Sequence, residues 1–98
     1  MNITKDRLDY AKAKAKYETL KSQAIQTPDI LDTNEYFDVF DNYLHAEQIL
    51  ILNTQELLKT KRPTDYAKVK DAFETRIYTR VLKEKLADLC FRLDVSTV

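Results

Sequence analysis

The chain has 98 residues, 16 basic and 16 acidic side chains, two prolines and no glycine. A length below the usual domain size of ~100–150 residues predicts a single domain, residues 1–98. The lack of glycine argues against a β architecture with many tight turns, which needs residues at positive φ. Hydrophobic residues make up 44% of the chain and the net charge is zero, which argues against disorder. These properties predict an all-α fold.

The first expected helix covers about residues 4–26. Apolar side chains recur there at steps of three and four, as on one face of an amphipathic helix, at Ile3, Tyr10, Ala13, Tyr17, Leu20 and Ala24. Pro28 ends the helix, because the residue before a proline avoids the helical region.

The second expected helix covers about residues 33–59 and starts at the capping sequence Asp32-Thr33-Asn34-Glu35, in which a carboxylate follows a capping side chain by three residues. One broad apolar face contains Tyr36, Val39, Phe40, Tyr43, Ala46, Leu50, Ile51, Leu57 and Leu58. Ile49 and Leu52 point away from the centre of that face, so the middle of the helix is apolar most of the way round. A helix of this kind is normally covered on more than one side, which predicts that it is the central element.

The third expected helix covers about residues 63–93, with Pro63 in its first turn. Its apolar stripe moves to nearly the opposite side at about Tyr78. Either the helix breaks or kinks near Tyr78 to Leu82, or it stays straight and its two halves pack against different surfaces. We favour the straight helix because neither proline nor glycine marks a break. The predicted architecture is a three-helix antiparallel bundle with a long C-terminal helix.

A long third helix also predicts self-association. Its end overhangs a compact monomer, because about thirty residues at 1.5 Å each extend well past the first helix. The overhang carries an apolar strip, formed by Leu82, Leu86, Leu89 and Leu93. Strips of this kind are normally buried against another chain, and a two-fold dimer is the commonest closed assembly. We therefore expect a homo-oligomer, with a dimer favoured.

Charge is distributed unevenly along the chain. No Lys or Arg occurs between Lys21 and Lys59, so residues 22–58 carry seven acidic side chains and no basic ones. The flanking segments carry the compensating positive charge. An acidic middle helix between two basic ones favours one topology, and this structural explanation is preferred. The alternative is electrostatic recognition of a partner, for which the candidate residues are Asp38, Asp41, Arg76 and Arg80.

No arrangement of residues predicts an enzyme, a metal centre or a cofactor site. Asp38, Asp41 and His45 share one helical face, but a single imidazole makes a poor transition-metal set, so a solvated polar face is favoured. Cys90 lies between two apolar residues and is expected to be a core residue rather than a nucleophile. Without glycine there is no phosphate-binding loop. We expect no catalytic residue, no metal and no cofactor.

The remaining prediction is a binding function in the cytoplasm. No apolar run approaches the ~20 residues of a membrane span, and a single cysteine fits a reducing compartment. We expect a small regulator, adaptor or inhibitor that binds another protein through helical surfaces. The alternative is a nucleic-acid-binding module with basic residues on the outer helices, at Lys5, Lys12, Lys16, Arg76, Arg80 and Lys83. Interspersed acids and a sequence pI of about 6.6 argue against that alternative.

Overall fold

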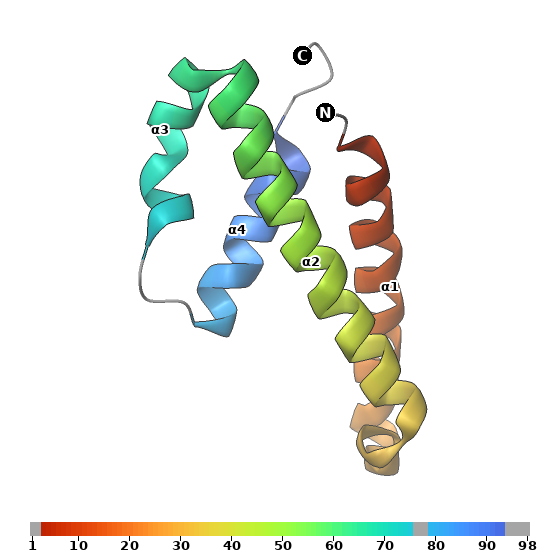
Figure 1. The fold of residues 1–98 in the computed structure, drawn as a ribbon. Helices are drawn as coiled ribbons and strands as arrows, with labels where there is room; N and C mark the ends of the chain where they lie inside the picture. Colours follow the sequence, from red (N-terminus) through yellow and green to blue (C-terminus); the bar gives the residue numbers. More distant parts are fainter. Residues whose placement is uncertain (1–2, 76–78, 94–98) are drawn as a thin grey trace.

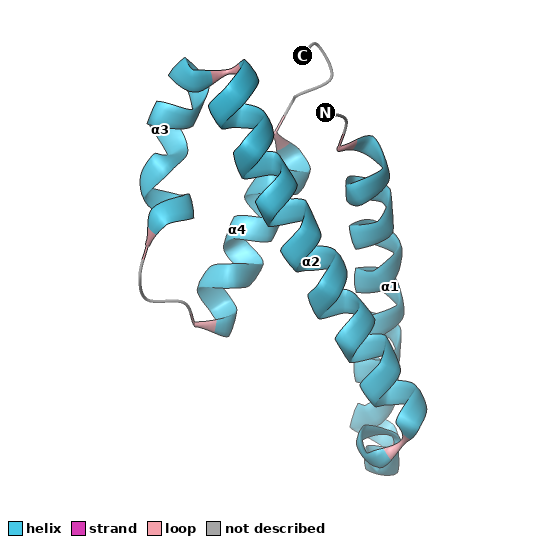
Figure 2. Ribbon diagram, viewed as in Figure 1, coloured by secondary structure: helices cyan, strands magenta, loops and turns pink. Residues whose placement is uncertain are grey.

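The structure is a computed structural model that describes residues 3–75 and 79–93. Within those ranges it contains only helices and the turns between them (Figure 2). The elements are α1 (Thr4–Gln26), the 3-10 helix η1 (Pro28–Asp32), α2 (Asn34–Lys61), α3 (Pro63–Glu74) and α4 (Arg80–Arg92). The all-α prediction is confirmed for this part of the chain.

Helices α1 and α2 form a long antiparallel hairpin (Figure 1). The chain leaves α1 just before Pro28 and turns through η1. Thr33 is the N-cap of α2, where its Oγ1 accepts a hydrogen bond from the backbone N–H of Tyr36 at 3.2 Å. Such a cap satisfies one of the unpaired amides at a helix start. The hairpin gives the molecule its length, with principal extents of 47 × 28 × 17 Å.

The prediction of one long C-terminal helix is wrong, because the chain breaks between α3 and α4. Helix α3 ends at Glu74, and Thr75 has an extended conformation with ψ 141°. Thr79 is also extended, and its Oγ1 accepts from the backbone N–H of Leu82 at 3.2 Å. Of the two alternatives at the change of stripe, the break is the one observed. Residue Tyr78 itself lies outside the described ranges.

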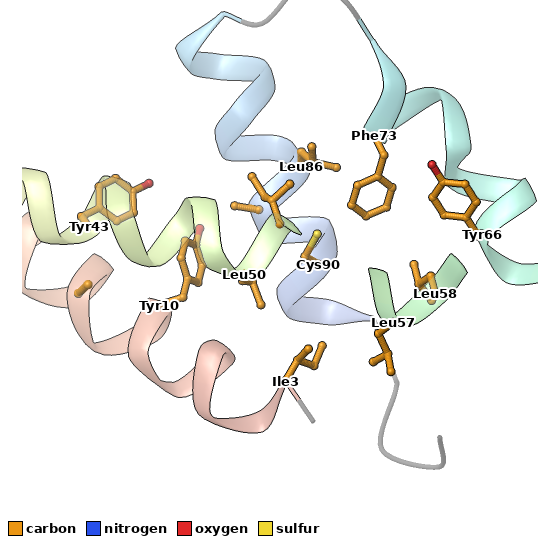
Figure 3. Packing of buried hydrophobic residues seen from close by; sticks show 13 residues of the cluster. Ile3, Tyr10, Tyr43, Leu50, Leu57, Leu58, Tyr66, Phe73, Leu86 and Cys90 are labelled. Atoms are coloured by element: carbon orange, nitrogen blue, oxygen red, sulfur yellow. The ribbon is translucent and has the colours of Figure 1, made fainter. Parts of the chain in front are cut away.

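Helix α2 is the central element, as expected from its broad apolar surface. It packs against α1, α3 and α4. The buried core draws on all four helices, with Tyr10, Tyr43, Leu50, Leu57, Leu58, Tyr66, Phe73, Leu86 and Cys90 among its members (Figure 3). The residue preceding α1, Ile3, is also buried there. The core therefore lies towards the end of the hairpin where α1 starts and α2 ends.

Three of the four leucines of the expected overhang pack within the chain. Leu86 is 4% exposed in the core, and Leu89 and Leu93 pack against the same cluster while Leu82 is 41% exposed. The break before α4 is the cause, since it lets this helix fold back across α2 (Figure 1). The prediction of an overhanging apolar strip is therefore wrong.

Candidate functional site

An ion pair between a buried carboxylate and a half-buried guanidinium anchors the start of α4 to α2. Glu47 is fully buried, and Arg80 donates to it twice, from Nη1 to Oε1 at 2.9 Å and from Nη2 to Oε2. The Arg80 guanidinium also lies 5.5 Å from the centre of the Tyr43 ring and contacts Glu84 at 3.3 Å. Burial lowers the pKa of Arg80, but the hydrogen bond and charge of Glu47 outweigh it and raise this pKa above its ordinary value. Arg80 is thus committed to a contact within the chain.

A second set of polar contacts holds the end of α4 to α1. Asp88 accepts from the Tyr10 hydroxyl at 3.0 Å and from Lys14 Nζ at 3.1 Å. Arg7 donates to the backbone carbonyl of Phe91 at 2.5 Å, with its guanidinium over the Phe91 ring. Burial is the main cause that raises the pKa of Tyr10 well above its ordinary value, so its hydroxyl remains a donor. Both ends of α4 are therefore fixed to the hairpin.

Past the start of α4, the face of the hairpin continues as an aromatic surface. We call Tyr17, Tyr36, Phe37 and Phe40 the aromatic platform. The rings of Tyr17 and Phe40 meet edge to face at 5.2 Å, and those of Tyr36 and Phe40 stack at 6.1 Å. Tyr17 also stacks on the core residue Tyr43 at 4.9 Å. Phe37 is 53% exposed and the other three are half-buried, so the core runs out into an open aromatic surface.

Three of the platform residues, Tyr36, Phe37 and Phe40, belong to an acidic end of the hairpin, which we call the hairpin tip, residues 25–41. The tip projects beyond α3 and α4 (Figure 1). Five acidic side chains are exposed on it, namely Asp29, Asp32, Glu35, Asp38 and Asp41. Ile25 and Leu31 add exposed apolar surface, at 82% and 43%. Among the described residues, the one cation on the platform is Lys21, whose Nζ lies 5.8 Å from the centre of the Tyr17 ring. The tip combines apolar surface with negative charge.

The four residues expected to take part in electrostatic recognition fall in different places. Asp38 and Asp41 are exposed on the hairpin tip, Arg80 is held by Glu47, and Arg76 lies outside the described residues. His45 is exposed as well. Within residues 3–75 and 79–93, no group of three or more His, Cys, Asp or Glu side chains is placed to hold a metal ion.

Cys90 is a core residue, as its apolar neighbours in the sequence predicted. It is fully buried, and burial raises the pKa of its thiol to about 12. The thiol is therefore protonated at neutral pH, and a thiolate nucleophile is not formed there.

Two features of the site escaped the sequence analysis. The first is Glu47, and its signal was a carboxylate within the apolar face of α2, between Tyr43 and Leu50. A charge in such a position is buried only with a partner. The second is the platform, because Tyr36 and Phe40 were assigned to a face that we expected to be covered throughout.

Comparisons with known proteins add no relative. No protein-family model matches the chain, and neither curated proteins nor solved structures show significant similarity to it. The helices of the described ranges are also too short or too polar for any of them to cross a membrane. A function is therefore inferred from the fold and its surfaces.

Proposed function

We propose that the chain is a small protein-binding adaptor or regulator, and that it docks a basic, amphipathic helical segment of a partner on the aromatic platform. One observation supports this most directly. The platform lies on the side of the hairpin that α4 covers, but beyond the Arg80 end of α4, so apolar surface of the same kind as the core is left open.

The chemistry of the platform favours a partner with both apolar and cationic side chains. Phe37 and the half-buried rings offer large apolar area, and aromatic residues of this kind act as anchors in protein interfaces. The exposed carboxylates of the tip attract positive charge and repel negative charge. Lys21 over the Tyr17 ring shows that the platform accepts a cation against its ring faces.

The same charges disfavour the nucleic-acid alternative at this site. Phosphate binding needs a one-sided basic surface, whereas the tip is acidic. Several basic side chains elsewhere are paired within the chain, as Lys14 is with Asp88 and Arg80 is with Glu47. The supporting measurement is a mobility shift at low ionic strength, in which we expect no submicromolar binding to generic DNA or RNA.

A designed peptide with the chemistry of the expected partner tests the proposal. The probe is a helical peptide of about 18 residues, with leucines on one face and lysines on the other. Titrated into the full chain, it is expected to shift the backbone amide signals of Tyr17, Tyr36 and Phe37, and to bind more weakly as salt rises. Phe37→Ala is expected to weaken binding by about tenfold, the loss of one interface anchor.

Two controls make the result specific. Leu8 is 52% exposed, almost the same as Phe37, but lies at the other end of α1, so Leu8→Ala is expected to leave binding unchanged. A second peptide carries glutamate in place of every lysine and is expected to bind poorly. Equal binding of the two peptides, or binding that Phe37→Ala leaves intact, would overturn the proposed site.

A further inference from the structure

A groove runs along the seam between α1 and α2, on the side away from α4. Its largest section has a volume of about 510 Å³. A second section shares Ala13, Lys16 and Asn42 with the first, and a third section shares Lys16 with both. The groove is therefore continuous towards the tip. Its lining includes Asp9, Lys12 and Lys16 of α1 and Asp38, His45 and Ile49 of α2.

Helical geometry places this groove opposite the side that α4 occupies. On α1, the residues that contact α4 are Arg7, Tyr10 and Lys14. Lys12 and Lys16 each lie two positions from Lys14, about 200° further round the helix. The groove and the aromatic platform are therefore separate surfaces.

The two rims of the groove carry opposite charge near the tip. Lys12 and Lys16 line it from α1, and Glu35 and Asp38 line it from α2. Across the described residues, none of these four side chains forms an ion pair within 4.0 Å, in contrast to Lys14, which is paired with Asp88. Each rim thus presents charge that the chain itself leaves uncompensated.

The other end of the groove carries apolar side chains of α2 opposite Asp6 and Asp9 of α1. Ile49 lines it, and Leu52 follows His45 and Ile49 at steps of four and three, so it lies on the same face of α2. Ile49 is half-buried and Leu52 is 52% exposed. These are the two residues that the sequence placed outside the main apolar face of α2, and α1, α3 and α4 leave them open to solvent.

We propose that a second copy of this chain covers the groove, with the two hairpins packed face to face about a two-fold axis parallel to the helices. Rotation about such an axis leaves the direction of each helix and its position along the axis unchanged, and it exchanges the α1 side and the α2 side of the groove. Helix α1 of one copy then lies over α2 of the other and runs antiparallel to it. Two residues at the same height on α1 and α2 of one copy therefore also face each other between the two copies.

This symmetry pairs the charged rims. Lys16 and Asp38 line the same section of the groove, so Lys16 of each copy faces Asp38 of the second copy, and the contact occurs twice. The end of the groove with Ile49 and Leu52 is covered at the same time. A two-fold axis across the helices instead lays α1 on α1 and α2 on α2, so Lys16 of one copy does not face Asp38 of the second, and the charge swap distinguishes the two axes.

A charge swap tests both the dimer and its symmetry. The wild-type chain is expected to be a dimer by sedimentation equilibrium at tens of micromolar. Lys16→Glu and Asp38→Lys each turn two attractive contacts into repulsive ones and are expected to raise the dissociation constant by about tenfold or more. An equimolar mixture of the two variants is expected to recover the wild-type affinity. In the mixed dimer, the introduced glutamate of one copy faces the introduced lysine of the other, and the second contact is the native one between Lys16 and Asp38.

Matched controls and defined outcomes complete the experiment. Lys68→Glu and Asp71→Lys change the same types of charge on exposed positions of α3 and are expected to leave the dimer unchanged. Circular dichroism establishes that each variant is helical. A monomeric wild type, a dimer insensitive to both groove variants, or a mixture no tighter than the single variants would each overturn the proposal.

Discussion

The two halves of the α1–α2 hairpin carry the same kinds of side chains under different cover. In the half beneath α4, Tyr10 and Tyr43 are each 2% exposed and hydrogen-bonded or stacked within the core. In the half towards the tip, Tyr17 and Tyr36 have similar ring contacts but stay half-buried. Tyr36 and Tyr43 are seven residues apart on α2 and so lie on one face of it.

The start of α4, rather than the choice of residue, therefore divides core from surface. One aromatic stripe of α2 packs as core where α4 lies on it and remains an exposed platform where α4 has not yet begun. Arg80, the first residue of α4, sits at the border and ties it to Glu47. The position of one helix end therefore sets the area available to a partner.

Stability depends most strongly on the ion pair at this border. Arg80→Ala leaves Glu47 buried without a counter-charge, which is expected to lower the free energy of unfolding by about 3–5 kcal/mol. Urea denaturation followed by circular dichroism measures the loss. The double variant Glu47→Leu with Arg80→Met removes both charges and is expected to recover most of it. A loss below about 1 kcal/mol for Arg80→Ala would mean that water reaches Glu47 and that α4 does not seal the border.

A matched pair of tyrosines compares the two halves directly. Tyr43→Ala is expected to cost about 3–5 kcal/mol, because it empties a buried site beside the ion pair. Tyr36→Ala removes a half-buried ring and is expected to cost about 1 kcal/mol. Chemical denaturation of both variants gives the comparison. Equal losses would contradict the division into a covered and an open half.

Alkaline pH is expected to act mainly on the covered half. Burial raises the pKa of Cys90 to about 12, and burial followed by the charge of Glu47 raises the pKa of Tyr43. In the unfolded chain the thiol ionises near about 8.5 and tyrosines near about 10, so the unfolded state loses protons first. The stability is therefore fully present below about pH 8.5 and is lost as the pH rises towards about 12, by about 1–2 kcal/mol at pH 10. Thermal unfolding between pH 7 and 10 measures this loss. Cys90→Ala is expected to make the stability depend less on pH in this range.

The smallest expected effect lies on the platform. Phe37→Ala is expected to change the free energy of unfolding by no more than about 0.5 kcal/mol, since its ring is more than half exposed. Leu8→Ala is the matched change at the far end of α1. A loss above about 2 kcal/mol for Phe37 alone would show that its ring is buried in the free protein, which contradicts an open docking surface.

The sequence predicted the helices of the hairpin well because their signals are local. The apolar period of α1, the proline after it and the capping residues of α2 act within a few positions of each other. The break after α3 was missed because its signals were sought in proline and glycine. The chain marks it instead with Thr75 and Thr79, two extended threonines, the second of which caps α4. The change of stripe near Tyr78 was the available sign of that break.

The candidate site could be predicted only in part. The gap in basic residues between Lys21 and Lys59 indicated an acidic surface, and the period of α2 placed Tyr36 and Phe40 on one face. Which part of that face stays open depends on where α4 docks, and this follows from contacts between residues far apart in the chain, such as Glu47 with Arg80. Periodicity in one helix carries no information on such contacts.

The bond from Arg7 to the carbonyl of Phe91 joins residues 84 positions apart and has a consequence for folding kinetics. The α1–α2 hairpin closes through η1 alone, whereas α4 reaches α1 only after nearly the whole chain is looped. Local contacts form fast, and a long loop costs entropy before its contacts form. We expect the hairpin to assemble first and α4 to dock last. In that interval the entire aromatic face is open, so a partner that binds early competes with α4 for the same surface.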